Sequence, residues 1–367
     1  QTTLGGVRLP TLAVDTARVS IEGTAPMAWV LSGTGNEPLE VVTTVEVASV
    51  RAAAASLDKL RMRTRAALHD QRGDGLDVDL DGSVHSIALH QPEPRIDLRP
   101  LLWSMRASRR GDRLSLSSLR IDLADRLHMV AKADVTAFLS PSPVIETLHV
   151  HIEPMVLSRL LELVPSTLRP PLTLGGKLAV DWSAQGTVPY VDLARWATPP
   201  VPATELSWQQ QLDGHWSYLE RWRTAFAQHL PFETELRLTL ADGAFALEGT
   251  RVRGLEGSVL AALSPTGPRL DIAVKAAQVD AQASIQDLAL FWQAAVTTRG
   301  ASTQGRATLG TLEHAALSAP LRNPSLVFDL AYEFSQDVLT ETLRVELPAP
   351  ATAMSVEGRV EHLWQTL

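Results

Sequence analysis

The chain has 367 residues, of which 45% are hydrophobic and 20% are charged, so it can bury a large core and is not globally disordered. Its net charge of −8 and its scattered basic residues argue against nucleic-acid binding, which depends on clustered lysines and arginines. The absence of cysteine excludes disulfides, cysteine zinc sites and thiol nucleophiles.

The sequence has no uninterrupted run of the roughly 18 apolar residues that a membrane-spanning helix needs. It begins with Gln1 and shows no leader with a basic and then an apolar region. We therefore expect a processed chain or a fragment, with any signal or membrane anchor lying outside it.

Alternation of apolar and polar residues dominates the first half of the chain. Residues 51–68 are rich in Ala and Arg and fit either a helix or a long strand. After them, alternation predicts strands within 76–89, 113–123 and 148–153. A sheet with one apolar face and one polar face follows from this pattern.

A few short segments have helical spacing instead. Residues 156–164 form an amphipathic run that Pro165 ends, and residues 287–295 place Leu288, Phe291 and Trp292 at similar spacing. The longest expected helix covers residues 214–230 and stops before Pro231.

The second half returns to alternating strands. The stretch "ELRLTLADGAFALEG" puts Leu236, Leu238 and Leu240 on one face, and Asp242-Gly243 then predicts a tight turn into a second strand. Residues 269–275 and 342–347 repeat the alternation, as do residues 177–183 of the first half.

The predicted organisation is two β-rich halves joined by a crossing segment. The halves cover residues 1–197 and 233–367, and residues 198–232 form a Pro- and Trp-rich connection with one helix. A helix, a break and a glycine-led strand recur loosely at 156–182 and 287–309, without the identity of a strict repeat.

No pattern of catalytic residues emerges. His149 and His151 share one strand face with Glu153, which could chelate a metal, but no second pair lies near in sequence and a solvated face explains them better. The carboxylates of "DVDLD" lack the spacing of a calcium loop. The glycine-rich residues 31–38 match no phosphate loop, and no nucleophile-elbow motif is present. We therefore predict a noncatalytic protein without metal or cofactor.

Two stretches, "LSRLLELVPSTLRPPLTLGGKLAVDWSAQGTVP" and "ELRLTLADGAFALEGTRVRGLEGSVLAAL", resemble the AsmA-like family of bacterial envelope proteins. The resemblance covers roughly residues 140–275. The first stretch matches the family pattern at Leu160, Leu161, Leu163, Pro165, Gly176, Leu178, Val180 and Asp181. The second matches it at Asp242, Gly243, Phe245, Leu247, Gly249, Gly254, Leu255 and Gly257.

The resemblance implies a mainly β fold: a long curved antiparallel sheet, shaped like a taco or gutter, with a few short helices and an apolar concave face. It also implies a periplasmic or cell-envelope protein of a Gram-negative bacterium that binds phospholipid or another acyl-chain lipid, conducts it between membranes and serves outer-membrane biogenesis. Alternation assigns the following residues to this lipid-binding groove: Leu148, Val150, Ile152, Leu178, Val180, Trp182, Leu236, Leu238, Leu240, Phe245, Leu247, Leu270, Ile272 and Val274.

Other interpretations remain open at this point. The apolar strand faces could instead pack against each other in a closed β body. Trp208, Trp216 and Trp222 could dock envelope partners, further copies or a membrane, which would suit a scaffold module, or could pack on the sheet. An enzyme on a β scaffold, such as a glycan hydrolase, would need two convergent carboxylates in a polar cleft.

Overall fold

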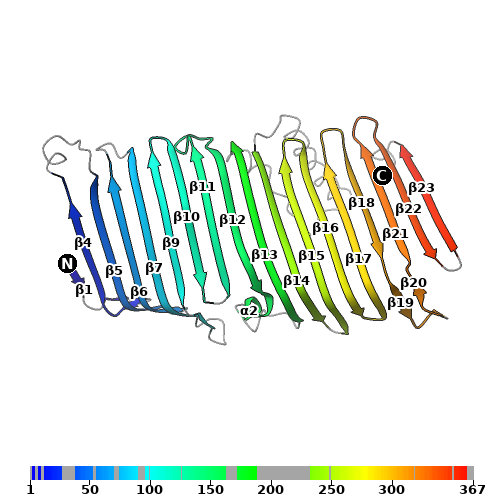
Figure 1. Cartoon of the computed structure of the whole chain (residues 1–367), viewed down its shortest axis with the longest axis horizontal. Helices are drawn as coiled ribbons and strands as arrows, with labels where there is room; N and C mark the ends of the chain where they lie inside the picture. Colours follow the sequence, from blue (N-terminus) through cyan, green and yellow to red (C-terminus); the bar gives the residue numbers. More distant parts are fainter. Residues whose placement is uncertain are drawn as a thin grey trace. The chain divides into compact units, whose positions relative to one another are not determined.

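The protein is described from a computed structural model, which divides into two compact units, Gln1–Pro170 and Pro171–Leu367, here called unit 1 and unit 2. Both units are antiparallel β-sheets, as the sequence predicts, and the described residues contain almost no helix (Figure 1). The structure describes residues 2–4, 7–9, 12–26, 38–52, 55–69, 74–89, 96–98, 100–124, 126–162, 172–187, 232–247, 249–317, 319–348 and 351–361.

Eight long or medium strands form the body of the unit 1 sheet, in the order β4–β5–β6–β7–β9–β10–β11–β12. Short strands extend this sheet beside β4, β5 and β7. The bounds are β1 (Thr2–Leu4), β2 (Val7–Leu9), β3 (Leu12–Val14), β4 (Ala17–Thr24), β5 (Leu39–Ala52), β6 (Ala55–Leu68), β7 (Gly75–Leu89), β8 (Ile96–Leu98), β9 (Leu101–Arg110), β10 (Arg113–Leu123), β11 (Leu127–Thr136) and β12 (Val144–Val156).

Nine strands form the body of the unit 2 sheet, in the order β13–β14–β15–β16–β17–β18–β21–β22–β23. Strand β19 pairs with β17, and β20 pairs with β19. The bounds are β13 (Leu172–Thr187), β14 (Phe232–Leu247), β15 (Thr250–Ser264), β16 (Gly267–Asp280), β17 (Ala283–Val296), β18 (Gly300–Thr308), β19 (Thr311–His314), β20 (Leu321–Arg322), β21 (Ser325–Glu333), β22 (Val338–Pro348) and β23 (Ala351–Glu361).

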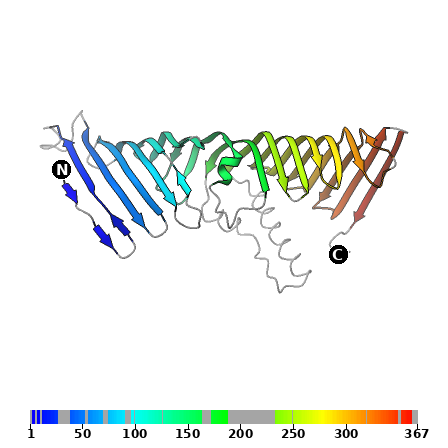
Figure 2. The same ribbon diagram turned by 90° about the horizontal axis from the view of Figure 1, so that it is seen from below.

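Within each unit the strands run side by side and the sheet curves, as the view along the sheet shows (Figure 2). Among the described residues no pairing joins β13 to β23, so the unit 2 sheet is open rather than a closed barrel. Consecutive strands are mostly joined by tight hairpins, which is what alternation with short polar breaks predicts.

The helix expected at residues 287–295 is wrong, because this segment belongs to strand β17. Leu288, Leu290 and Trp292 recur every second residue and face one side, while Phe291 lies on the other side and is 45% exposed. The spacing of Leu288, Phe291 and Trp292 fitted a helix only because apolar residues occur on both faces of this strand. The loose recurrence that this helix supported is therefore wrong as well.

The tight turn expected at Asp242-Gly243 is also wrong. Strand β14 runs through these residues without a break, and Asp242 has a φ of 52°. The register shifts between Leu240 and Gly243, so the Asp-Gly pair forms a β-bulge inside one strand. A left-handed residue can serve either purpose, and only the pairing partner on β15 distinguishes the two.

The ambiguous segment at 51–68 is largely strand β6. The expected helix at 156–164 is reduced to the single turn α2 (Leu157–Leu161) within the described residues. Residues 55–68 form a strand because β5 and β7 pair with them along their length. An isolated helix of this length would be only marginally stable in water.

Candidate functional site

A groove with a volume of about 850 Å³ lies in unit 2. It crosses eight strands, from β13 to β22, near the hairpins that join β15 to β16, β17 to β18 and β21 to β22. Its lining is Trp182, Phe232, Thr234, Leu236, Ala261, Ala262, Leu263, Pro268, Arg269, Leu270, Ala294, Ala295, Val296, Ala301, Ser302, Thr303, Leu330, Tyr332 and Leu339.

The register explains why so many apolar residues meet here. Residues directly opposite each other in antiparallel strands point to the same side of the sheet. The row through Val180 therefore places one residue of each of nine strands on one side, which we call the apolar face of unit 2. This row contains Val180, Leu238, Val259, Ile272, Trp292, Gly305, Phe328, Leu343 and Val356.

Two neighbouring rows continue this face. On the groove side lie Trp182, Leu236, Ala261, Leu270, Ala294, Thr303, Leu330, Glu341 and Gly358. On the other side lie Leu178, Leu240, Gly257, Val274, Leu290, Ala307, Leu326, Val345 and Met354. One ionisable side chain, Glu341, interrupts these three rows.

Large apolar side chains on this face remain accessible among the described residues. Trp182 is 41% exposed and Trp292 is 36% exposed, and Leu236, Leu343 and Val356 are comparably open. An accessible apolar surface that extends over this many strands is more than a soluble monomer usually leaves to water.

Several polar side chains in and beside the groove are already paired inside the protein. The indole nitrogen of Trp182 donates to the hydroxyl of Thr234 at 2.8 Å, and that hydroxyl donates to the carbonyl of Ser183 at 3.0 Å. The indole nitrogen of Trp292 donates to the hydroxyl of Thr303 at 2.6 Å. The groove therefore presents aromatic and aliphatic surface and few unpaired donors.

Two further lining residues turn their polar atoms to partners of their own. The Tyr332 hydroxyl donates to Asp337 at 2.7 Å. The Arg269 guanidinium contacts both oxygens of Asp271, at 2.7 and 3.0 Å, and this carboxylate raises the pKa of Arg269. Their polar atoms are thus occupied by other side chains.

Glycines let aromatic rings lie flat across the apolar face. Phe328 lies opposite Gly305, and a methyl group at Gly305 would come within 2.4 Å of the Phe328 ring. Only the absence of a side chain at Gly305 makes room for the ring. Gly305 therefore allows the Phe328 ring to lie close to the sheet in the row beside the groove.

Most residues assigned to the groove by alternation fall in these rows. Trp182, Leu236 and Leu270 line the groove itself. Val180, Leu238 and Ile272 form the adjacent row, followed by Leu178, Leu240 and Val274. Phe245 and Leu247 lie in β14 beyond the bulge at Asp242, opposite Leu174 and Leu172 of β13.

The other three assigned residues, Leu148, Val150 and Ile152, belong to β12 of unit 1. They lie opposite Ala133, Ala131 and Met129 of β11. The row through Ile152 continues across unit 1 through Met129, Ile121, Trp103, Gly82, Met62 and Val45. Unit 1 thus has an apolar face of its own.

The alternation missed the residues that close the groove on its β17 to β22 side. Ala294, Val296, Ala301, Leu330 and Leu339 line it from these strands. The error at 287–295 hid β17. Strand β18, "GASTQGRAT", has too few large apolar residues to show a period.

The candidate polar sites lie elsewhere. Arg63 and Arg65 of β6 lie directly opposite Asp81 and Asp79 of β7, on the polar face of unit 1, as a solvated charged face requires. His149 lies opposite Lys132. Within the described part of the chain, no group of three or more metal-ligating side chains comes together.

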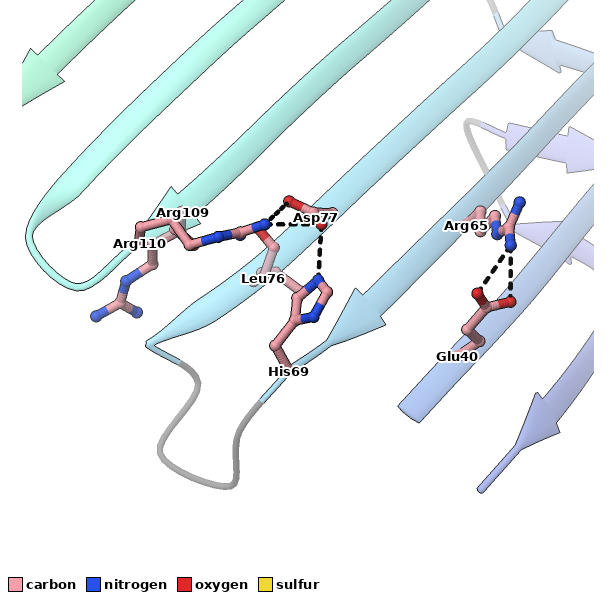
Figure 3. Close-up of polar contacts among 7 residues, drawn as sticks. All are labelled: Glu40, Arg65, His69, Leu76, Asp77, Arg109 and Arg110. Atoms are coloured by element: carbon pink, nitrogen blue, oxygen red, sulfur yellow. Dashed lines mark hydrogen bonds and ion pairs between the residues drawn. The ribbon is translucent and has the colours of Figure 1, made fainter. Parts of the chain in front are cut away.

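Asp77, which precedes Asp79 and Asp81 in the stretch "DVDLD", accepts hydrogen bonds from His69 and Arg110 (Figure 3). His69 Nε2 lies 2.7 Å from one carboxylate oxygen, and Arg110 approaches the two oxygens at 2.8 and 2.9 Å. Burial raises the pKa of Asp77, but these two hydrogen bonds and the nearby positive charges outweigh it, so its pKa lies below the ordinary value. The cluster is a structural ion-pair network.

Trp208, Trp216 and Trp222 lie outside the described residues, as does the crossing segment up to residue 231. Comparison with known protein families, curated proteins and solved structures gives no match. In the residues that the structure describes, no helix is both long and apolar enough to cross a membrane.

Proposed function

We propose that this protein is a noncatalytic binder of lipid acyl chains and that the groove of unit 2 holds them. The observation that carries the proposal is the chemistry of the groove. Its surface is aromatic and aliphatic, and the indole and hydroxyl groups in it are hydrogen-bonded to one another.

The energetics favour a hydrocarbon over a polar ligand. Each methylene that leaves water contributes about 0.8 kcal/mol. A polar ligand group would lose its hydration and find few partners, because the Trp182 and Trp292 donors are already used. No cofactor is part of this proposal.

The wider role follows from the resemblance to AsmA-like proteins, which we propose as the family of this chain. In this role it would conduct phospholipid or another acyl-chain lipid between membranes of a bacterial envelope, from the periplasm or from a membrane-anchored position. Its partners would be lipids and, in the envelope, other proteins or further copies.

An alternative is a scaffold module that docks a protein partner. The observation that favours it is the apolar exposure of β23, where Met354 is 56% and Val356 is 47% exposed, because large apolar patches also mark protein interfaces. In this alternative the groove would be filled by a protein side chain and not by lipid.

The test is the lipid content of the purified chain, measured by native mass spectrometry and by extraction from the same sample. We expect copurifying acyl lipid in the wild type and its loss in Leu236→Asp, which places a carboxylate in the groove lining. At least a tenfold loss is expected, since a charge on an apolar binding surface costs several kcal/mol.

Thr239→Asp is the matched control, because Thr239 lies on the same strand, is exposed and points to the opposite face. It introduces the same charge and should keep the lipid. A well-folded, lipid-free wild type that also fails to take up added fatty acid would refute the proposal and leave the scaffold as the better account.

A further inference from the structure

The hairpins beside the groove carry a cation whose side chain has no partner among the described residues. Three turns, at 264–267, 297–300 and 334–337, border the groove, and we call them the groove rim. Arg299 lies in the middle turn, between the lining residues Val296 and Ala301. No hydrogen bond or ion pair is formed by its guanidinium within the described part of the chain.

The backbone of Arg299 is nevertheless held on both sides. Its N–H donates to the Thr297 hydroxyl at 3.2 Å, and its carbonyl accepts from the Phe334 N–H of the neighbouring hairpin at 3.0 Å. Thr297 also donates to the Gly300 carbonyl, which closes the turn. The backbone of Arg299 is therefore held in place beside the groove.

The nearby carboxylates have other partners. Asp271 is taken by Arg269, and Asp337 accepts from Tyr332. Glu333 accepts from Ser335 and Gln336, both at 3.1 Å. Glu333 and Asp337 keep their negative charge, because their donors are neutral, but neither they nor Asp271 forms an ion pair with Arg299 among the described residues. The Arg299 guanidinium is therefore available to an external anion.

We propose that Arg299 binds the anionic head of the amphiphile whose acyl chain lies in the groove. This inference rests on the proposed function, because without a chain in the groove the head has no anchor. The chemistry required is a compact anion, a carboxylate or a phosphate, and both match the planar donor array of an arginine.

The experiment compares three probes with the same alkyl chain, namely laurate, dodecyl phosphate and dodecanol. Binding to the full chain is measured by calorimetry below the micelle concentration of each probe. We expect the anionic probes to bind about fivefold more tightly than the alcohol, as an exposed charge pair allows. The preference should shrink as salt is raised.

Arg299→Gln should lose this preference and keep wild-type affinity for dodecanol. Arg322→Gln is the matched control, since Arg322 is an exposed arginine of unit 2 near the opposite ends of β18 and β21. Its preference should equal that of the wild type.

Several outcomes separate this inference from the proposed function. If all three probes bind equally well, or if Arg299→Gln keeps the preference, the anionic site is refuted while the groove stands. If none of the three binds, the proposed function itself fails. Tighter binding of laurate or of dodecyl phosphate supports the site and shows which anion it favours.

Discussion

The polar faces of the two units are held together in different ways. In unit 1, several ion pairs link neighbouring strands, such as Glu46 with Arg61 across β5 and β6 and Asp79 with Arg106 across β7 and β9, although Arg120 and Asp122 pair along β10. In unit 2, each of the ion pairs found among the described residues joins two positions on one strand. These pairs are Glu235–Arg237, Arg269–Asp271, Arg344–Glu346 and Arg359–Glu361.

The difference shows that the two units share one construction on the apolar face but not on the polar face. Both apolar faces come from alternation read across neighbouring strands. Ion pairs between strands contribute to the association of neighbouring strands in unit 1, and this contribution depends on pH and salt. Ion pairs along one strand do not link that strand to its neighbours. Unit 2 instead has the apolar groove.

The sharpest way to test this comparison uses a feature that both units have. Gly82 of unit 1 lies opposite Trp103, as Gly305 of unit 2 lies opposite Phe328, and a methyl group at either glycine would collide with the ring. We expect Gly82→Ala and Gly305→Ala each to lower the free energy of unfolding by about 1–3 kcal/mol. Urea unfolding measures both.

Only Gly305→Ala should also weaken acyl-chain binding, because it raises a ring on the face that carries the groove. Gly175→Ala is the control within unit 2, since a methyl group there meets only Ala244, at 3.4 Å. If Gly82→Ala reduced binding as much as Gly305→Ala, the assignment of binding to unit 2 would be wrong.

The alternation of apolar and polar residues was enough to predict a mainly β sheet and to predict which residues of a strand share its apolar face. Period-two spacing predicts that Trp182, Leu236 and Leu270 face one side, and the register places them in one row, with Ala261 between Leu236 and Leu270. It could not locate the groove, because this depends on which strands pair and how the sheet bends. Small residues such as Ala301 line the groove yet carry no periodic signal.

The errors at residues 242–243 and 287–295 share one local feature. Asp242 and Asp287 both have a φ near 52° inside strands, where a short polar residue tolerates the left-handed region. In sequence, the same residue type suggests a turn or the start of a helix. Only the partner strands, β15 for Asp242 and β16 for Asp287, hold the chain extended through these points.

The next prediction concerns the hydrogen bond from Trp292, in the row beside the groove, to the lining residue Thr303. Trp292→Phe removes the donor that reaches Thr303, and we expect a loss of about 0.5–1.5 kcal/mol in unfolding free energy. A double-mutant cycle with Thr303→Val isolates the pair from the loss of ring area. A coupling energy near zero would show that the indole does not depend on this hydroxyl.

The smallest expected effect concerns the polar face of unit 1. Asp122 accepts from Arg120 at 2.6 Å and from His128 of the neighbouring strand at 2.8 Å, and the hydrogen bond from Arg120 is the largest cause that lowers the pKa of Asp122. A carboxyl whose pKa is lower in the folded chain stabilises the fold above its unfolded pKa. This stability is lost as the pH falls through the folded value.

Asp122→Asn should therefore be less stable than the wild type at neutral pH, by at most about 1 kcal/mol because the site is near the surface. The difference should begin to shrink near pH 3.8, the ordinary value for an aspartate, and vanish below the folded pKa. Unfolding monitored by hydrogen exchange in β10 and β11 measures it. If the difference stayed constant down to acid pH, the hydrogen bonds of Asp122 with Arg120 and His128 would not depend on its charge.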